Sequence, residues 1–173
     1  MYSADYFGGK YSSLERIKVI CGDITKQIEF DKPIDTIIHC AANVKHYGVY
    51  QDFYDVNVAG TKNVIEFAKE KDALLIHVST MAVSGNAFDH DPDFSMTVFD
   101  ESKLYIGQPL SNVYIRSKFK AERAVLEARS DGLNTVIIRV GNLSNRRADL
   151  VFQKNYDENA TLTRLRAIAD LGV

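Results

Sequence analysis

The chain has 173 residues, of which 46% are hydrophobic and 25% charged, a balance typical of one globular domain with a sizeable core. Its net charge of −2, without a stripe of lysine and arginine, argues against nucleic acid or an anionic membrane as the main partner. No run approaches the roughly 20 apolar residues of a membrane span, and the amino terminus lacks a signal-peptide pattern, so we expect a cytoplasmic protein.

Short apolar runs alternate with periodic segments along the first half of the chain. Residues 16–21 and 35–40 are apolar and rich in isoleucine, and they predict two strands. Within residues 51–71 the apolar side chains recur close to the 3.6-residue period of a helix. Residues 73–79 predict a third strand.

The second half continues the alternation after a polar interruption. Residues 86–108 carry Asp and Pro without a clear period and predict a loop. A second helix is predicted over 112–129, with Ser111 as its N-cap. A fourth strand follows over 134–140, and residues 160–171 at the end of the chain predict a further helix.

Apolar strands alternating with amphipathic helices predict an α/β fold, with a parallel sheet covered by helices on both faces. Ligands of such sheets bind beyond the carboxyl ends of the strands, so the residues that follow each strand become candidates for a site. These candidates are Asp23, Ala41, Ala42, Ser79, Thr80, Gly141 and Asn142.

The cysteines and histidines predict no metal centre. Cys21 and Cys40 each end an apolar run, and neither has the close Cys or His spacing of a metal site. We expect two reduced thiols in the core, without a disulfide. His39 and His77 lie within predicted strands and are expected to be core histidines.

Tyr114 and Lys118 are four residues apart on a predicted helix and therefore share a face. An ammonium about 4 Å from a phenolate contributes roughly 4 kcal/mol at an effective dielectric near 20, which is about three pKa units. Such a phenol can transfer protons, and Thr80 is placed to hold a substrate carbonyl oxygen beside it. The spacing alone is weak evidence, because Tyr6 and Lys10 repeat it around two glycines that predict a turn.

The context of this pair resembles the extended short-chain dehydrogenase/reductases. The matching segments come in that family's order: HCAA at 39–42, NVAGT at 57–61, VSTMAV at 78–83 and YIRSK at 114–118. Within the family the chain most resembles the thioester reductase domains that end nonribosomal peptide synthetases, which are related to carboxylic acid and fatty acyl reductases. The narrowing features are GDIT at 22–25, the segment 99–114, and Ser117-Lys118 with Glu122 following.

The resemblance implies roles for individual residues. Tyr114 would protonate the carbonyl oxygen, and Thr80 would hydrogen-bond that oxygen. Lys118 would hold the nicotinamide ribose and lower the pKa of Tyr114, while Asn57 would support a proton relay from within its helix. The cofactor-binding positions that the resemblance implies are Asp23, Ile24, Ala41, Ala42, Lys118, Gly141 and Asn142.

The resemblance also implies a cofactor, a substrate and a partner. NADPH is the expected cofactor, with NAD left open. The substrate would be an acyl or peptidyl thioester on a phosphopantetheinyl carrier protein, released as an aldehyde or alcohol.

One feature of the family is missing from the sequence. The family opens with a strand and a glycine-rich turn that binds the pyrophosphate, whereas Gly8 and Gly9 follow no strand. We therefore expect one partial NAD(P)-binding Rossmann-like domain over 1–173, without the first two strands and truncated at both ends. Its cofactor affinity should be at least about a thousandfold reduced, so the isolated chain should reduce nothing at a useful rate. Exposed strand edges predict self-association.

Two other functions stay open. A sugar-nucleotide epimerase or dehydratase of the same superfamily would share the Thr, Tyr and Lys, and a non-catalytic interaction module or remnant would keep the motifs by descent. Several candidates also have simple structural explanations. Asp23 suits an ordinary turn, Thr80 a strand cap, and Gly141 with Asn142 a further turn.

Overall fold

The computed structural model of the protein describes residues 17–45, 47–85, 98–143, 147 and 160–172. The chain divides into two compact units, one of residues 22–141 and one of residues 1–21 together with 142–173. The second Tyr–Lys pair and the two early glycines, all within residues 6–10, lie outside the described residues.

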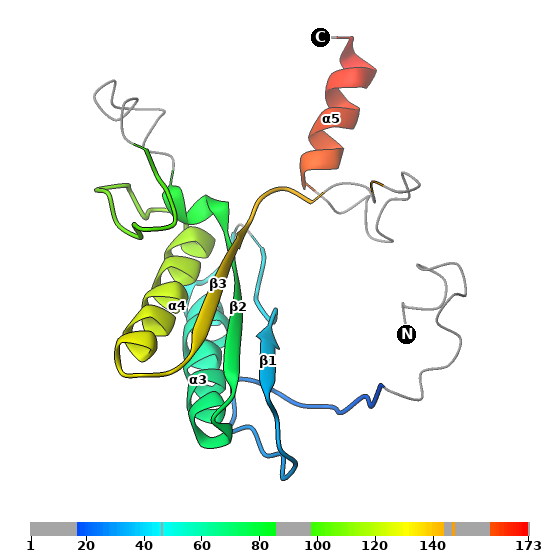
Figure 1. Cartoon of the computed structure of the whole chain (residues 1–173). Coiled ribbons are helices and arrows are strands. Elements are labelled where there is room, and N and C mark those ends of the chain that lie inside the picture. The colour runs from blue at the N-terminus through cyan, green and yellow to red at the C-terminus, as the bar shows by residue number, and fades with distance from the viewer. Residues whose placement is uncertain (1–16, 46, 86–97, 144–146, 148–159, 173) are drawn as a thin grey trace. The chain divides into compact units, whose positions relative to one another are not determined.

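Three parallel strands form one sheet in the first unit, in the order β1-β2-β3 (Figure 1). Their bounds are β1 (Thr36–His39), β2 (Leu74–Thr80) and β3 (Thr135–Val140). The register aligns His39 with His77, and His77 with Ile137. The parallel sheet confirms the α/β class and the three strands predicted over 35–40, 73–79 and 134–140.

Helices fill the connections between the strands. Between β1 and β2 the chain forms α2 (Tyr50–Phe53), a π-helical segment (Tyr54–Ala59) and α3 (Gly60–Lys71) without interruption. A short 3-10 helix (Met81–Ser84) follows β2, α4 (Val113–Ser130) precedes β3, and α5 (Ala160–Leu171) belongs to the second unit. The three predicted helices are therefore confirmed. None of the described helices is long and apolar enough to cross a membrane.

Both long helices of the first unit, α3 and α4, pack on the same face of the sheet (Figure 1). Leu75 and His77 of β2 are buried beneath them. In the described part of this unit, α3 and α4 cover one face of the sheet, whereas Ile38, Val136 and Ile138 on the opposite face are exposed. Parallel crossovers are right-handed, so strands that advance in one direction across a sheet place successive helices on the same side.

The core lies between the sheet and these two helices. Its buried members come from α3, β2 and α4: Val64, Ile65, Ala68, Leu75, Ala124, Val125 and Ala128. His39 and His77 are also buried, as predicted. The C-terminal edge of the sheet above this core is where β2 meets the first turns of α4, and these elements position the candidate site.

The first predicted strand, residues 16–21, is wrong for its described part. Residues 17–21 lie outside regular structure and are exposed. A strand needs a hydrogen-bonded neighbour, and the observed sheet ends at β1.

The prediction of core thiols is also wrong. Cys21 belongs to this exposed segment, and Cys40 is exposed where the chain leaves β1.

The N-cap of α4 is one residue later than predicted. The Oδ1 atom of Asn112 accepts hydrogen bonds from the backbone amides of Tyr114 at 2.9 Å and Ile115 at 3.1 Å. Asn112 is therefore the N-cap in place of Ser111. Both residue types are good caps, and the choice between them depends on where packing against the sheet starts the helix.

Candidate active site

The predicted tyrosine and threonine meet where β2 ends. Thr80 is the last residue of β2, and its side chain is hydrogen-bonded to that of Tyr114 in the first turn of α4. The Thr80 hydroxyl oxygen also accepts the backbone amide of Ala82 at 3.2 Å. That bond orients the hydroxyl. Two residues 34 positions apart in the chain (80 and 114) thus place their hydroxyls together at the carboxyl edge of the sheet.

The electrostatics at Tyr114 differ from the expectation. Burial raises the pKa of the Tyr114 phenol, and the hydrogen bond to Thr80 only opposes this rise. The prediction that Lys118 lowers the pKa of Tyr114 is therefore wrong. The ammonium of Lys118 instead donates to the backbone carbonyl of Val78 at 2.9 Å.

Lys118 is itself strongly affected by its surroundings. The residue is 4% exposed, and burial lowers the pKa of its ammonium from 10.5 to about 8. The nearby Glu122 and Cys40 act in the opposite direction. An ammonium carries three N–H donors, and the bond to Val78 uses one of them.

Asn57 connects three separate parts of the site. It is 1% exposed and lies in the π-helical segment, an uncommon geometry that often marks functional positions. Its Oδ1 atom accepts the amide of Asn43 at 2.6 Å, and its Nδ2 atom donates to the Asn43 carbonyl at 3.0 Å. The same Nδ2 donates to the hydroxyl of Ser117 at 2.8 Å. Asn57 thereby joins the loop after β1 to the first turns of α4.

The segment that contains Asp23 and Ile24 forms a turn packed on α3. The Asp23 carboxylate accepts the hydroxyl and the amide of Thr25 at 2.8 and 3.0 Å, and these bonds lower its pKa. Ile24 packs against Gly60, where an added Cβ would lie 2.8 Å from its Cδ1 atom. The simple turn explanation of Asp23 thus has direct geometric support, and a role in cofactor binding stays a prediction.

The remaining cofactor-binding candidates follow β1 and β3. Ala41 is exposed and Ala42 is half-buried beyond the end of β1. Gly141 is exposed beyond the end of β3, where an added Cβ would lie 3.9 Å from the Cγ atom of Met81. Asn142 is exposed and belongs to the second unit.

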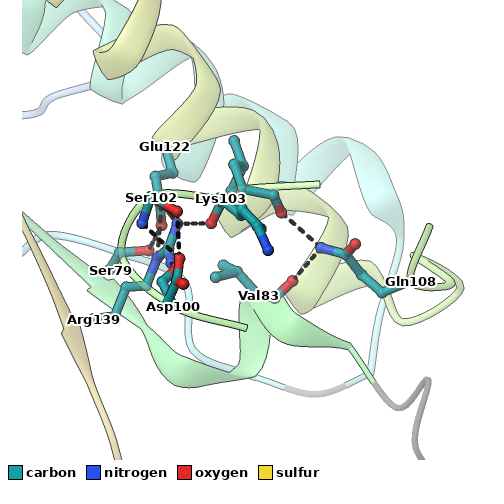
Figure 2. A network of polar contacts seen from close by, with 9 residues as sticks. Ser79, Val83, Asp100, Ser102, Lys103, Gln108, Glu122 and Arg139 are labelled. Carbon is teal, nitrogen blue, oxygen red and sulfur yellow. Dashed lines mark hydrogen bonds and ion pairs between the residues drawn. The ribbon is translucent and has the colours of Figure 1, made fainter. Parts of the chain in front are cut away.

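Sequence reasoning missed a buried charged network behind the site, shown in Figure 2. Ser79, Glu122 and Arg139 are linked through side-chain hydrogen bonds. The sequence singles out Ser79 at the end of its strand and Glu122 as part of a motif, but it does not connect them and does not single out Arg139. The sequence offered one signal for this network, since Arg139 is the only charged residue of the predicted strand 134–140. A buried cation requires an anionic partner, and Glu122 on the buried face of α4 supplies it.

The donor set suits a nicotinamide cofactor with a carbonyl substrate. Two hydroxyls and an ammonium, those of Thr80, Tyr114 and Lys118, gather at the carboxyl ends of parallel strands, where ligands of such sheets bind. The described residues contain no cluster of His, Cys, Asp or Glu that could hold a metal ion. The arrangement can orient a carbonyl oxygen and deliver a proton to it.

Comparison with known proteins identifies the family. The model of the NAD-binding male sterility protein family matches residues 2–156. The chain belongs to this family. As a male sterility family member it is an extended short-chain dehydrogenase/reductase, and its fold matches that of reductase domains from nonribosomal peptide synthesis.

Two solved structures and one enzyme illustrate the family's relatives. A thiolation-reductase di-domain from an archaeal nonribosomal peptide synthetase is 44% identical, with a TM-score of 0.83, over 97% of this chain and 47% of that chain. The reductase domain of the aureusimine biosynthetic cluster is 37% identical, with a TM-score of 0.70, over 84% and 37%. The sterol-4-alpha-carboxylate 3-dehydrogenase erg26 of Schizosaccharomyces pombe is 33% identical over 70% of this chain and 35% of its own length.

The male sterility family member described here therefore spans less than half of the length of these relatives. What the comparisons show for this chain is an NAD(P)-binding oxidoreductase family and the reductase fold. The choice between NAD and NADP, the substrate and the activity of the chain itself are proposals.

Proposed function

We propose that the chain carries the catalytic residues of an NADPH-dependent thioester reductase, which releases a carrier-bound acyl or peptidyl chain as an aldehyde. One observation carries the proposal: the hydroxyls of Thr80 and Tyr114 are hydrogen-bonded at the end of β2, with Lys118 one helical turn further along α4. The 44% identity to a thiolation-reductase di-domain over nearly the whole chain supports the thioester as substrate.

The proposed chemistry starts from the thioester carbonyl. NADPH, when bound, supplies the hydride for the carbonyl carbon. Thr80 would hydrogen-bond the carbonyl oxygen as negative charge develops on it, and Tyr114 would donate a proton to that oxygen. The C–S bond of the resulting hemithioacetal then breaks, the hydroxyl proton passes to sulfur, and an aldehyde and the thiol of the phosphopantetheine arm are released. A second round would give an alcohol.

The pKa directions bear on these roles in different ways. Burial raises the pKa of the Tyr114 phenol, so the phenol is neutral and carries the proton that it would donate, but it is a weaker acid than the sequence predicted. Lys118, with a pKa of about 8, is mainly an ammonium at pH 7 and would hold the ribose hydroxyls. Asn57 would fix the loop after β1 against α4. The other proposed cofactor contacts are Asp23, Ile24, Ala41, Ala42, Gly141 and Asn142.

A chimera tests this function. The segment of the archaeal di-domain that matches this chain would be replaced by residues 1–173, and an acyl group would be loaded on its thiolation domain. We expect NADPH consumption with release of an aldehyde, measured by absorbance and mass spectrometry. Tyr114→Phe should lower the rate at least about 100-fold, because it removes the proton donor.

Tyr54→Phe is the matched control, since it removes a hydroxyl from a tyrosine outside the candidate site and should leave the rate unchanged. Folding and NADPH binding of each chimera are checked by circular dichroism and fluorescence. A folded chimera that binds NADPH and forms no aldehyde, or that tolerates Tyr114→Phe, contradicts the proposal.

A further inference from the structure

Helix α4 contacts β2 through a stripe of three residues at spacings of four. Tyr114, Lys118 and Glu122 lie one above the other on the face of α4 that meets the sheet. Each of them bonds one of three consecutive residues at the end of β2: Tyr114 with Thr80, Lys118 with Val78, and Glu122 with Ser79. Tyr114 and Lys118, which we propose to be catalytic, are thus two of three residues through which α4 bonds the end of β2, and the third is Glu122.

Glu122 is held on both carboxylate oxygens (Figure 2). The Ser79 hydroxyl donates to Oε2 at 2.6 Å. On the other side, Arg139 Nε and Nη2 donate to Oε1 at 2.9 and 2.6 Å. Glu122 is only 1% exposed, and a carboxylate buried to this degree requires such partners to remain charged.

The same guanidinium binds a second segment, residues 99–103, which we call the wall segment. Arg139 Nη1 donates to the carbonyl of Asp100 at 2.7 Å, and Nη2 donates to that of Lys103 at 2.7 Å. The guanidinium also lies 4.6 Å from the centre of the Phe99 ring. The wall segment, Met81, β3 and α4 line an open pocket of about 860 Å³. Arg139 therefore connects a wall of this pocket to the end of β2.

We propose that Glu122 and Arg139 are positioning residues that lock the wall segment to the catalytic end of β2 and keep Tyr114 and Lys118 in register with it. The effect on catalysis rests on the proposed function. The connection of the wall segment to β2 through Arg139 and Glu122, which we call the coupling, does not. The charge of Glu122 also opposes the effect of burial on Lys118, since the carboxylate raises the pKa of that ammonium.

Two variants of the 173-residue chain test the coupling. Arg139→Lys keeps the positive charge but loses the planar fork that binds Glu122 and two carbonyls together. Hydrogen exchange measured by mass spectrometry should become at least about tenfold faster in the wall segment. Glu122→Gln removes the charge, and NMR titration of the lysine Cε signals should show a lower pKa for Lys118.

Glu127→Gln is the matched control, because Glu127 lies on the same helix in an exposed ion pair with Arg123 and should change neither measurement. If Glu122→Gln does not fold, the double variant Glu122→Gln/Arg139→Gln removes both buried charges and is titrated instead. A shift of the Lys118 titration is a result that a purely structural role of Glu122 would not produce.

Unchanged exchange in the wall segment of Arg139→Lys, or an unchanged Lys118 titration without the Glu122 charge, overturns the proposal. Both measurements are made without catalysis. A chimera that forms no aldehyde while these two results hold would reject the proposed function and leave the coupling intact.

Discussion

At the scale of single residues, two buried histidines lie next to the proposed catalytic lysine. The rings of His39 and His77 are 5.2 Å apart. Nε2 of His39 is hydrogen-bonded to the hydroxyl of Thr61 at 2.9 Å. Among the described residues, neither ring nitrogen of His77 has a hydrogen-bond partner. Burial is the main cause that lowers the pKa of both rings, to about 4 for His39 and about 2 for His77, and the Lys118 ammonium adds to it.

These pKa values predict a loss of stability in acid. Between pH 6.5 and about 4 the unfolded chain binds protons on both rings while the folded chain does not, so the free energy of unfolding falls as pH falls. The slope is about 1.4 kcal/mol per pH unit for each histidine. His77→Leu should halve the part of this slope that the two rings contribute, as measured by urea unfolding at pH 7, 6 and 5. An unchanged slope in His77→Leu would show that His77 is protonated in the folded state.

At the scale of elements, the start of α4 depends on which of two adjacent residues is its N-cap. Ser111 and Asn112 are adjacent residues of equally good capping type, and only Asn112 makes the capping bonds. The position matters for the site, since the cap receives the amide of Tyr114 itself. A loosened first turn would move the phenol relative to Thr80.

Alanine variants at these two positions separate the candidates. Asn112→Ala should reduce the free energy of unfolding by about 1 kcal/mol, because two amides at the start of α4 lose their acceptor. Ser111→Ala is the control, and should change stability by less than about 0.5 kcal/mol as an exposed substitution outside the helix. Urea unfolding of both variants measures the difference. Equal losses would mean that the cap alternates between the two residues.

At the scale of the whole molecule, the described part of residues 22–141 brings the proposed catalytic side chains together, but no pyrophosphate cradle follows its three strands. Each of the three strands is followed by a different structure: the loop after β1, the 3-10 helix after β2, and Gly141 after β3. None of these is a glycine-rich turn that opens a helix, which is the element that binds pyrophosphate in related folds. Self-association through the edges of the sheet stays a prediction.

The isolated chain is therefore expected to bind NADPH weakly. Loss of about three charge-assisted backbone bonds, each contributing roughly 1.5–3 kcal/mol, lowers affinity a thousandfold or more. Fluorescence titration of the 173-residue protein should show no saturation up to about 0.1 mM NADPH, whereas the chimera should saturate. Micromolar binding by the isolated chain would contradict this. A chimera that also fails to bind would favour a non-catalytic interaction module.

Much of the fold could be predicted because it depends on local pattern. Three of the four strands and all three of the helices predicted from apolar runs and the 3.6-residue period are present, and the alternation of the two types implied a parallel sheet. The run at 16–21 shows the limit of such evidence. Its residues have strand-forming side chains, yet its described part pairs with no neighbour, and pairing is not a local property.

The sequence by itself determined the order of elements, the burial of His39 and His77, and the shared face of Tyr114 and Lys118, since each depends on spacing along one element. Only the tertiary structure decided the contacts across elements. The bond from Asn57 to Ser117 spans 60 positions and that from Ser79 to Glu122 spans 43, and such pairs leave no periodic trace in a single sequence. The rise in the Tyr114 pKa has the same origin, because burial depends on which elements pack together.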